Sequence, residues 1–398
     1  MNDNVIDKAP TDSDDDRPAA LQRALEGALG VPFTFGNRID VLRNGREIFP
    51  AMLAAVEAAQ ETIDLLTFVY WQGAIAQRFA EALAGQARAG VRVRVLLDAV
   101  GAARMKRECL DVMTRAGVEV EWFRPPVRWR VWQTDNRTHR KVLVCDRRVG
   151  FTGGVGIAQE WEGDARHPGE WRETHFRIEG PAVHGLHAAF LGNWAEAGRR
   201  EYEDLDSMPA LADCGDARLQ VVRSTAAIGW SDVATVLRAV LKVAQRRLRI
   251  TSPYFVPDPV LAALLAATAA RGVRVEVLVP GPHHDQRVSQ LATQDDFRQL
   301  LDAGIRIYRY QPTMLHAKVV SVDGELACVG SANFNQRSMR KDDEICVQVL
   351  HRPTVQRLDL QFEADLERSL PLDLREWRRR GPLQRLGELL VRPIRHQT

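Results

Sequence analysis

The sequence predicts an α/β protein made of two pseudo-symmetric halves, each an α-β-α sandwich in which a sheet lies between layers of helices. Short apolar runs alternate with segments long enough to be helices, which is typical of parallel βαβ units. This alternation occurs twice in the 398-residue chain. Residues 89–93 (AGVRV) are echoed by residues 271–275 (RGVRV), and residues 116–120 (AGVEV) by residues 303–307 (AGIRI). Such self-similarity indicates a duplicated unit.

The first half is expected to alternate helices and strands before it ends in strands that follow one another directly. Apolar residues recur with the helical period in the longer segments and form short runs in the strands. The predicted elements are helix 46–61, strand 63–70, helix 75–89, strand 91–97, helix 104–115, strand 118–123, strands 139–145, 148–153 and 172–178, and helix 182–197.

The second half repeats this plan. Its predicted elements are strand 248–252, helix 258–270, strand 273–279, helix 286–302, strand 305–310 and strand 315–322. The joint is placed around residues 200–216, where acidic residues, Pro209 and Gly215 cluster. We therefore divide the chain into a first half, residues 21–205, and a second half, residues 206–370.

The two ends of the chain differ from the body in composition. Residues 1–20 are polar, acidic and punctuated by proline, which predicts disorder. A short amphipathic helix should follow, since Leu21, Leu25 and Leu29 share one helical face. The tail, residues 371–398, is basic with leucines at helical spacing, and is predicted to be amphipathic.

Composition restricts the classes of protein that the chain can represent. A hydrophobic fraction of 45% and a charged fraction of 27% are those of a soluble globular protein. The net charge of +2 argues against a dedicated nucleic-acid binder, which is more often strongly basic. No run reaches the roughly 18 to 20 apolar residues of a membrane span, and no signal peptide is recognisable. The five cysteines form no C-x-x-C pair, so we expect a reducing compartment and no metal site.

One polar motif occurs once in each half. Residues 139–154 (HRKVLVCDRRVGFTGG) and 316–331 (HAKVVSVDGELACVGS) both read H-x-K-x4-D-x6-G-G/S. Side chains two residues apart in a strand share a face, so His and Lys should emerge side by side. A single histidine is usually structural, but that explanation would have to hold for both motifs at once. Two halves folded about a pseudo-twofold axis would bring both pairs into one cleft.

Two histidines and two lysines in one cleft suit phosphoryl transfer without a metal or other cofactor. One neutral imidazole can attack phosphorus and form a covalent phosphohistidine. The other, protonated, can donate to the departing oxygen and later activate the incoming hydroxyl. The lysines can hold the non-bridging oxygens of the phosphate. Asn333 can add a neutral donor, and glycines after each motif allow the backbone to approach the phosphate closely.

The duplicated motif resembles the active-site motifs of the phospholipase D superfamily, and the wider sequence is similar to its bacterial cardiolipin synthase branch. The resemblance runs from about residue 33 to the C-terminus and includes residues 41–45, 171–181, 252–258, 311–316 and 330–334. It implies two phospholipase D-type halves that share one active-site cleft. It also implies a phosphatidyltransferase that converts two phosphatidylglycerol molecules into cardiolipin and glycerol.

The same resemblance implies roles for individual residues. Glu173 and Glu344 would hold the far nitrogens of the histidines, and His139 would be the usual nucleophile with His316 as acid and base; the residues alone do not decide between the two. Asp146 and Asp323 complete the motifs, but we expect them to brace the motif loops. The implied catalytic set is His139, Lys141, Asp146, His316, Lys318 and Asp323, supported by Gly153, Gly154, Glu173, Ser331, Asn333 and Glu344.

Three positions depart from the family pattern. Gly156 occupies in the first half the place that Asn333 has in the second. Glu173 stands where Asp is commoner, which should change reach and not role. Asp342 stands where this branch often has Asn, so the charges beside Glu344 should differ.

A loop rich in arginine and tryptophan interrupts the first half. It contains Arg128, Trp129, Arg130 and Trp132. Tryptophan favours the membrane interface and arginine meets phosphate there, so the loop and the basic tail are candidates for contact with an anionic membrane. Packing of these tryptophans on the domain beneath is an equal alternative.

The partners and location follow from this interpretation. We expect a phospholipid substrate, peripheral attachment to the membrane from the cytoplasm, and no nucleic acid. A monomer suffices, because one chain supplies both halves of the site. The alternatives are a phospholipase D hydrolase that releases phosphatidic acid, a nuclease of the same superfamily, and a membrane scaffold with a vestigial site.

Overall fold

The computed structural model describes residues 16–125, 135–198, 208–225, 232–285 and 297–373. In the first half the elements are β1(Thr34–Arg43), α2(Asn44–Ala58), β2(Thr62–Thr67), α3(Ala74–Arg88), β3(Arg92–Asp98), α4(Arg107–Arg115), β4(Glu119–Phe123), β5(Val142–Cys145), β6(Val149–Gly153), β7(Thr174–Glu179) and α5(Val183–Glu196). A 3-10 turn, η2(Gln159–Trp161), lies in the loop before β7.

The second half has corresponding elements. They are β8(Ala217–Ser224), α6(Asp232–Val243), β9(Arg247–Thr251), β10(Phe255–Val256), α7(Pro259–Ala270), β11(Arg274–Pro280), β12(Arg306–Tyr310), β13(Val319–Val322), β14(Leu326–Gly330), β15(Phe334–Asn335), α9(Gln336–Arg340), β16(Glu344–Leu350), α10(Arg352–Leu366) and β17(Ser369–Pro371). Of the predicted helix 286–302, residues 297–302 are helical and the rest lies outside the described residues.

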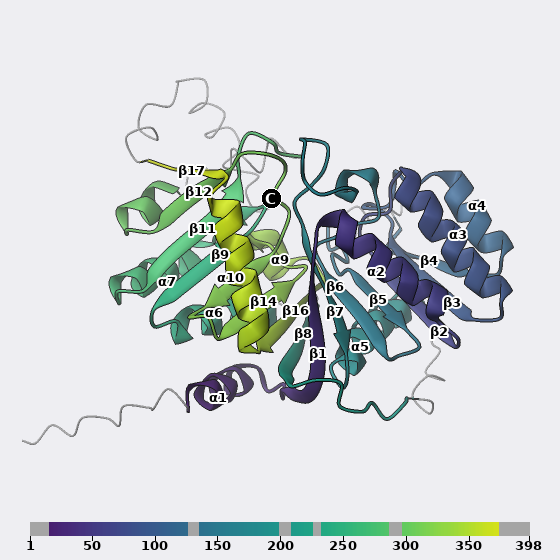
Figure 1. Cartoon of the computed structure of the whole chain (residues 1–398), viewed down its shortest axis with the longest axis horizontal. Helices are drawn as coiled ribbons and strands as arrows, with labels where there is room; N and C mark the ends of the chain where they lie inside the picture. Colours follow the sequence, from purple (N-terminus) through teal and green to yellow (C-terminus); the bar gives the residue numbers. More distant parts are fainter. Residues whose placement is uncertain (1–15, 126–134, 199–207, 226–231, 286–296, 374–398) are drawn as a thin grey trace, which may run out of the picture.

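The duplication is visible in one 15-stranded mixed sheet (Figure 1). From the centre outward, the first half runs β1-β7-β6-β5-β2-β3-β4 and the second runs β8-β16-β14-β13-β9-β11-β12, with β17 at its far edge. β1 and β8 join the halves antiparallel through their first residues, with Thr34 opposite Leu219 and Asn37 opposite Ala217. The predicted α/β duplication is therefore confirmed.

The predicted βαβ units are also correct. β2, β3 and β4 are parallel neighbours, as are β9, β11 and β12. The elements that were not predicted include β14, β16, α6 and α10, and also β1 and β8, the two strands at the centre of the sheet. In β1, Gly36, Asn37, Arg38 and Asp40 interrupt the apolar residues, so it lacks the apolar run by which the other strands were recognised.

Helices cover both faces of each half. α2, α3 and α4 pack on one face of the first half, and α5 packs on the other. In the second half α6 and α7 lie on one face, and α10 crosses the other (Figure 1). Consecutive apolar residues of one strand serve opposite layers: Leu65 faces the α2–α3 side and Leu66 the α5 side. This explains why these strands are apolar almost throughout.

The N-terminal helix α1(Arg17–Leu29) corrects two predictions. It begins at Arg17, so the segment predicted to be disordered as far as residue 20 is helical at its end. It was also assigned to the first half, yet Leu21 and Leu25 are buried in the core of the second half, against α6. Arg17 adds ion pairs to Asp323 at 2.6 Å and to Glu325 at 3.0 Å. Within the described residues, no helix has the length and apolar character needed to cross a bilayer.

Candidate active site

The two histidines lie just before β5 and β13, where the chain crosses to the other half. The main-chain N–H of His139 donates to the carbonyl of Asp343 at 2.9 Å, and that of His316 donates to the carbonyl of Arg172 at 2.8 Å. The strands predicted to begin at residues 139 and 315 therefore begin later, at Val142 and Val319. The residues before them pair with the opposite half, because the two motifs meet at the joint.

Each histidine is held by a carboxylate from the other half. His139 Nδ1 lies 3.0 Å from Glu344 Oε1, and His316 Nδ1 lies 2.6 Å from Glu173 Oε2. Both glutamates are fully buried. An Nδ1–H that donates to a carboxylate leaves Nε2 as the reactive nitrogen. The crossed pairing was not specified by the sequence, in which each glutamate simply follows one motif.

The two carboxylates have different surroundings. The hydroxyls of Ser331 and Ser338 both donate to Glu344, the latter at 2.6 Å. Burial raises the pKa of Glu344, but His139, Lys141 and Ser331 outweigh it and lower the pKa to about 2. Glu344 is therefore held firmly as an anion.

Besides the histidine, Glu173 also accepts two hydrogen bonds, but they are longer and neither comes from a hydroxyl. Its partners are the indole N–H of Trp161 at 3.3 Å and the main-chain N–H of Thr174 at 2.9 Å. Burial raises the pKa of Glu173 above its usual value despite the nearby charge of Lys318. The two halves thus supply chemically unequal carboxylates.

The lysines come together with the histidines, as the motif spacing predicts. Lys141 Nζ donates to the carbonyl of His139 at 2.7 Å, and Lys318 Nζ lies 2.9 Å from His316 Nδ1. Burial and then the charge of Lys318 lower the pKa of Lys141 to about 7. Burial lowers the pKa of Lys318 to about 8, against the pull of Glu173 and Glu344.

The histidine rings lie in unequal environments. The side chain of His139 is 12% exposed, and its ring meets the edge of Phe68 at 5.2 Å between centroids. His316 is 6% exposed, and three aromatic rings surround it: Trp161 and Trp171 at 5.2 Å and Tyr254 at 6.4 Å.

In the free site, burial and neighbouring charges favour the neutral form of both imidazoles. Burial lowers the pKa of His139 to about 4, partly offset by Glu344. Burial, Lys318, Lys141 and His139 hold the pKa of His316 well below its usual value. The four motif side chains are therefore close enough to influence one another's protonation.

The glycines after the first motif make room for β7. A Cβ at Gly154 would lie 2.5 Å from the carboxylate oxygens of Glu173, and one at Gly153, where φ is +147°, would lie 2.5 Å from His175 Nδ1. In the second half Ser331 replaces the second glycine and binds Glu344. Asn333 is buried, and its main-chain N–H donates to Ser338 Oγ at 3.1 Å.

Asp146 and Asp323 lie beyond the far ends of the motif strands. Asp146, at φ +51°, accepts from the main-chain N–H groups of residues 60–62 at 2.7–3.1 Å. Asp323, at φ +56°, accepts from those of residues 245–247 at 2.7–3.0 Å. Their carboxylates thus bind turns of their own half, and the histidines bind the glutamates.

Several residues at the site were not predicted. The aromatic residues Phe68, Trp161, Trp171 and Tyr254, together with Ser338, were not assigned to it. Two tryptophans in or near polar loops, Trp161 and Trp171, were the available signal, because a large apolar ring in such a loop needs a packing partner. The predicted membrane-contact residues Arg128, Trp129, Arg130 and Trp132, and the tail from residue 374, lie outside the described residues.

Comparison with known proteins agrees with this architecture. Residues 52–161 and 237–366 match the family model described as "cardiolipin synthase, PLD-like domain". The chain is 33% identical over 365 residues to a cardiolipin synthase of Geobacillus kaustophilus, covering 91% of this chain and 72% of that one. It is 34% identical over 381 residues to cardiolipin synthase A of Pseudomonas aeruginosa, covering 94% and 76%.

A solved structure supports the fold. The phosphatidylserine synthase of Haemophilus influenzae superimposes with a TM-score of 0.70 over 95% of this chain and 100% of that one, at 15% identity. Two equivalent halves in one sheet, with a His–Lys motif from each at the joint, define an enzyme of the phospholipase D type. Within that class, the chain belongs to the cardiolipin synthase family, and its activity is that of a phosphatidyltransferase.

Proposed function

We propose that the enzyme transfers a phosphatidyl group from one phosphatidylglycerol to a hydroxyl of a second, giving cardiolipin and glycerol through a phosphohistidine. The observation that supports this most strongly is the pair of imidazoles at the joint, each held at Nδ1 by a buried glutamate of the opposite half. With both far nitrogens held, two Nε2 atoms remain for the reaction. The relatives named cardiolipin synthase support the choice of lipid.

In the first step, His139 Nε2 attacks the phosphorus of the donor lipid. The bond from phosphorus to the glycerol oxygen breaks, and His316, protonated in the complex with the anionic substrate, gives its proton to that oxygen, so glycerol leaves. The greater exposure of His139 supports its role as nucleophile. Lys141 and Lys318 neutralise the non-bridging oxygens.

In the second step, His316 takes the proton from a hydroxyl of the acceptor lipid. That oxygen attacks phosphorus, the phosphorus–nitrogen bond breaks, and His139 returns to its neutral form. Glu344 and Glu173 keep both rings oriented throughout. The aromatic rings around His316 reduce the space for water, which favours an alcohol over hydrolysis.

The test is incubation with phosphatidylglycerol vesicles, followed by mass spectrometry of the lipids. We expect cardiolipin from the wild type, and a loss of at least about a hundredfold in rate for His139→Ala and for His316→Ala. Phosphatidic acid without cardiolipin would show a hydrolase instead. DNA strand cleavage that is lost in His139→Ala would show a nuclease.

The intermediate can be located separately. Rapid acid-free quenching and peptide mapping should find the phosphatidyl group on the peptide that contains His139. Label found only on the peptide of His316 would reverse the two roles and leave the reaction class unchanged.

We also propose peripheral attachment to an anionic membrane from the cytoplasm. Residues 128–132 and the basic tail are the expected contacts, on the basis of their composition. The full chain should sediment with vesicles that contain phosphatidylglycerol and not with neutral phosphatidylcholine vesicles, and about 0.5 M salt should release it. Equal binding to both vesicles would contradict an electrostatic contact.

A further inference from the structure

Two buried arginines support the two glutamates of the site. Each is 2% exposed, and each donates to the main-chain carbonyl of one glutamate: Arg140 to Glu344 at 3.2 Å and Arg172 to Glu173 at 2.5 Å. A full positive charge in the interior requires partners, because an unpaired one is very costly. The partners of the two arginines differ, and this difference distinguishes the two histidine–glutamate pairs.

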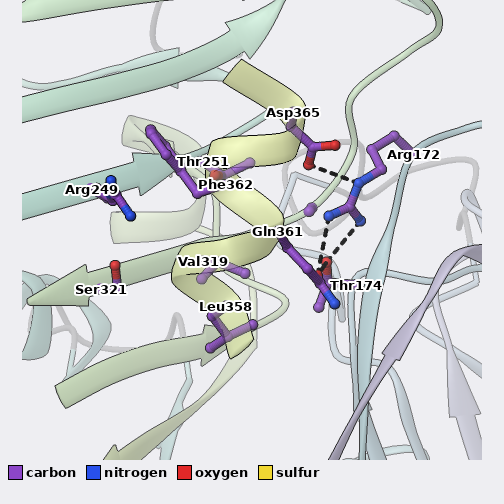
Figure 2. Close-up of a pocket in the computed structure, with 11 residues that line it drawn as sticks. Arg172, Thr174, Arg249, Thr251, Val319, Ser321, Leu358, Gln361, Phe362 and Asp365 are labelled. Carbon is purple, nitrogen blue, oxygen red and sulfur yellow. Dashed lines mark hydrogen bonds and ion pairs between the residues drawn. The ribbon is translucent and has the colours of Figure 1, made fainter. Parts of the chain in front are cut away.

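Arg172 connects the site to α10 (Figure 2). Its Nε donates to Asp365 at 2.8 Å, and its terminal nitrogens donate to Thr174 Oγ1 at 2.9 Å and to Gln361 at 3.2 Å. Asp365 also pairs with Arg43, the last residue of β1, at 3.1 Å. One guanidinium therefore binds the glutamate strand and the helix that covers it.

The main chain of Arg172 strengthens this connection. Its N–H donates to the carbonyl of Met314 at 2.8 Å, and its carbonyl accepts from the N–H of His316 at 2.8 Å. A shift of Arg172 would move His316 and Glu173 together. Arg172 thus joins three parts of the described structure: Glu173, the main chain of His316 and, through an ion pair, Asp365 on α10.

The His139–Glu344 pair has the opposite arrangement. There Arg140 comes from the histidine strand and binds neutral groups, namely the carbonyls of Ala189 and Ser224 and the amide of Asn193. The position that corresponds to Arg140 in the second motif is Ala317, which borders the same pocket as Arg172. For the His316–Glu173 pair the supporting arginine therefore lies on the glutamate strand of the first half, and its acid comes from α10 of the second half.

We infer that Arg172, fixed by Asp365 on α10, is a positioning residue that sets the geometry of the Glu173–His316 pair. Besides His316, the Glu173 carboxylate accepts a long bond from the indole N–H of Trp161, at 3.3 Å, and one from the adjacent main-chain N–H of Thr174, so its direction depends on the main chain. Glu344 differs in that two serine hydroxyls hold its carboxylate directly. The kinetic part of the inference rests on the proposed function; the spectroscopic part does not.

The decisive variants are Arg172→Met, which removes every bond of the guanidinium, and Asp365→Asn, which keeps the shape and removes the charge. We expect Arg172→Met to lower kcat at least about tenfold with little change in KM, because a misplaced acid/base group slows chemistry and leaves binding intact. Asp365→Asn should act in the same direction and more weakly. Arg172→Lys, which can satisfy one of the two anchors, should restore part of the rate.

Arg249 provides a matched control. It is 5% exposed, borders the same pocket and binds the same helix through Asp359 and Glu363, at 3.2 Å and 2.9 Å, yet it contacts no residue of the site (Figure 2). Arg249→Met should cost comparable thermal stability and leave kcat near the wild-type value. If the two methionine variants lose kcat equally, Arg172 has only a structural role and the inference is wrong.

The histidine proton gives a readout that needs no substrate. In the wild type the Nδ1 proton of His316 should give a downfield resonance, protected by Glu173, that disappears in His316→Ala. In Arg172→Met and Asp365→Asn this resonance should shift upfield or be lost through faster exchange with solvent. In Arg249→Met it should persist. An unchanged resonance in Asp365→Asn and Arg172→Met would overturn the inference whether or not the protein makes cardiolipin. A changed resonance in a protein without transferase activity would refute only the proposed function.

Discussion

At the scale of single residues, the site contains two buried lysines whose charged form a substrate anion would stabilise. The pKa of Lys141 is about 7 and that of Lys318 about 8, in each case chiefly because burial disfavours the charged form. A bound phosphate would favour the charged form and raise both values. The free enzyme near pH 8.5 should therefore hold these lysines largely neutral.

Anion binding should accordingly take up protons. With sulfate, which exchanges no proton of its own in this range, we expect uptake on the order of one proton per ion bound near pH 8.5. Sulfate affinity should fall as the pH rises from 6 to 9, since the lysines lose their protons in that window. Calorimetry in buffers of different ionisation enthalpy measures both quantities. Binding without proton uptake, or unchanged in Lys141→Met, would show that the ion lies elsewhere.

Glu344 is the second residue whose environment predicts a kinetic effect. Ser338→Ala removes a hydroxyl that donates at 2.6 Å to the carboxylate that holds His139. Loss of a hydrogen bond to a charged group costs about 1.5 kcal/mol or more, so kcat should fall about tenfold. Ser321→Ala is the control, because Ser321 is equally buried and donates to Asp359, outside the site. Equal rates for the two variants would contradict a role for Ser338 in the site.

At the scale of elements, α1 is part of the core of the second half. Leu25 is fully buried against that core, whereas Arg23 on the same helix is 65% exposed. Leu25→Ala should lower the free energy of unfolding by about 2–5 kcal/mol, the cost of a cavity in a packed core. Arg23→Ala should change it by less than about 0.5 kcal/mol. Denaturant unfolding measures both, and a small effect of Leu25→Ala would mean that α1 is not docked.

At the scale of the whole molecule, each half supplies the glutamate that holds the histidine of the other half, so the two halves form one site. A double-mutant cycle tests it directly. Glu173→Gln should add little to the loss already caused by His316→Ala, because both changes disable the same pair. The losses of rate from Glu173→Gln and from Glu344→Gln should be nearly additive in the double variant. Stronger coupling of Glu173 to His139 than to His316 would contradict the crossed arrangement.

Much of this organisation could be predicted from local patterns. Many elements lie within a few residues of their predicted bounds, because periodicity and apolar runs are local properties. They are the helices α2 to α5 and α7, and the strands β2 to β7, β9 and β11 to β13. β1 and β8 were missed because polar residues interrupt them. α1 was assigned to the wrong half because an amphipathic face does not specify what will cover it.

The sequence by itself determined the duplication, the α/β class and the four motif side chains that meet at the site, because a repeated spacing can be read directly from the sequence. Only the tertiary structure decided which glutamate serves which histidine, which rings enclose His316, and that Arg172 reaches Asp365 across 193 positions. The physical reason is that these contacts depend on how two halves dock. Docking is a property of buried surfaces and their charges, and residue spacing along the chain does not encode it.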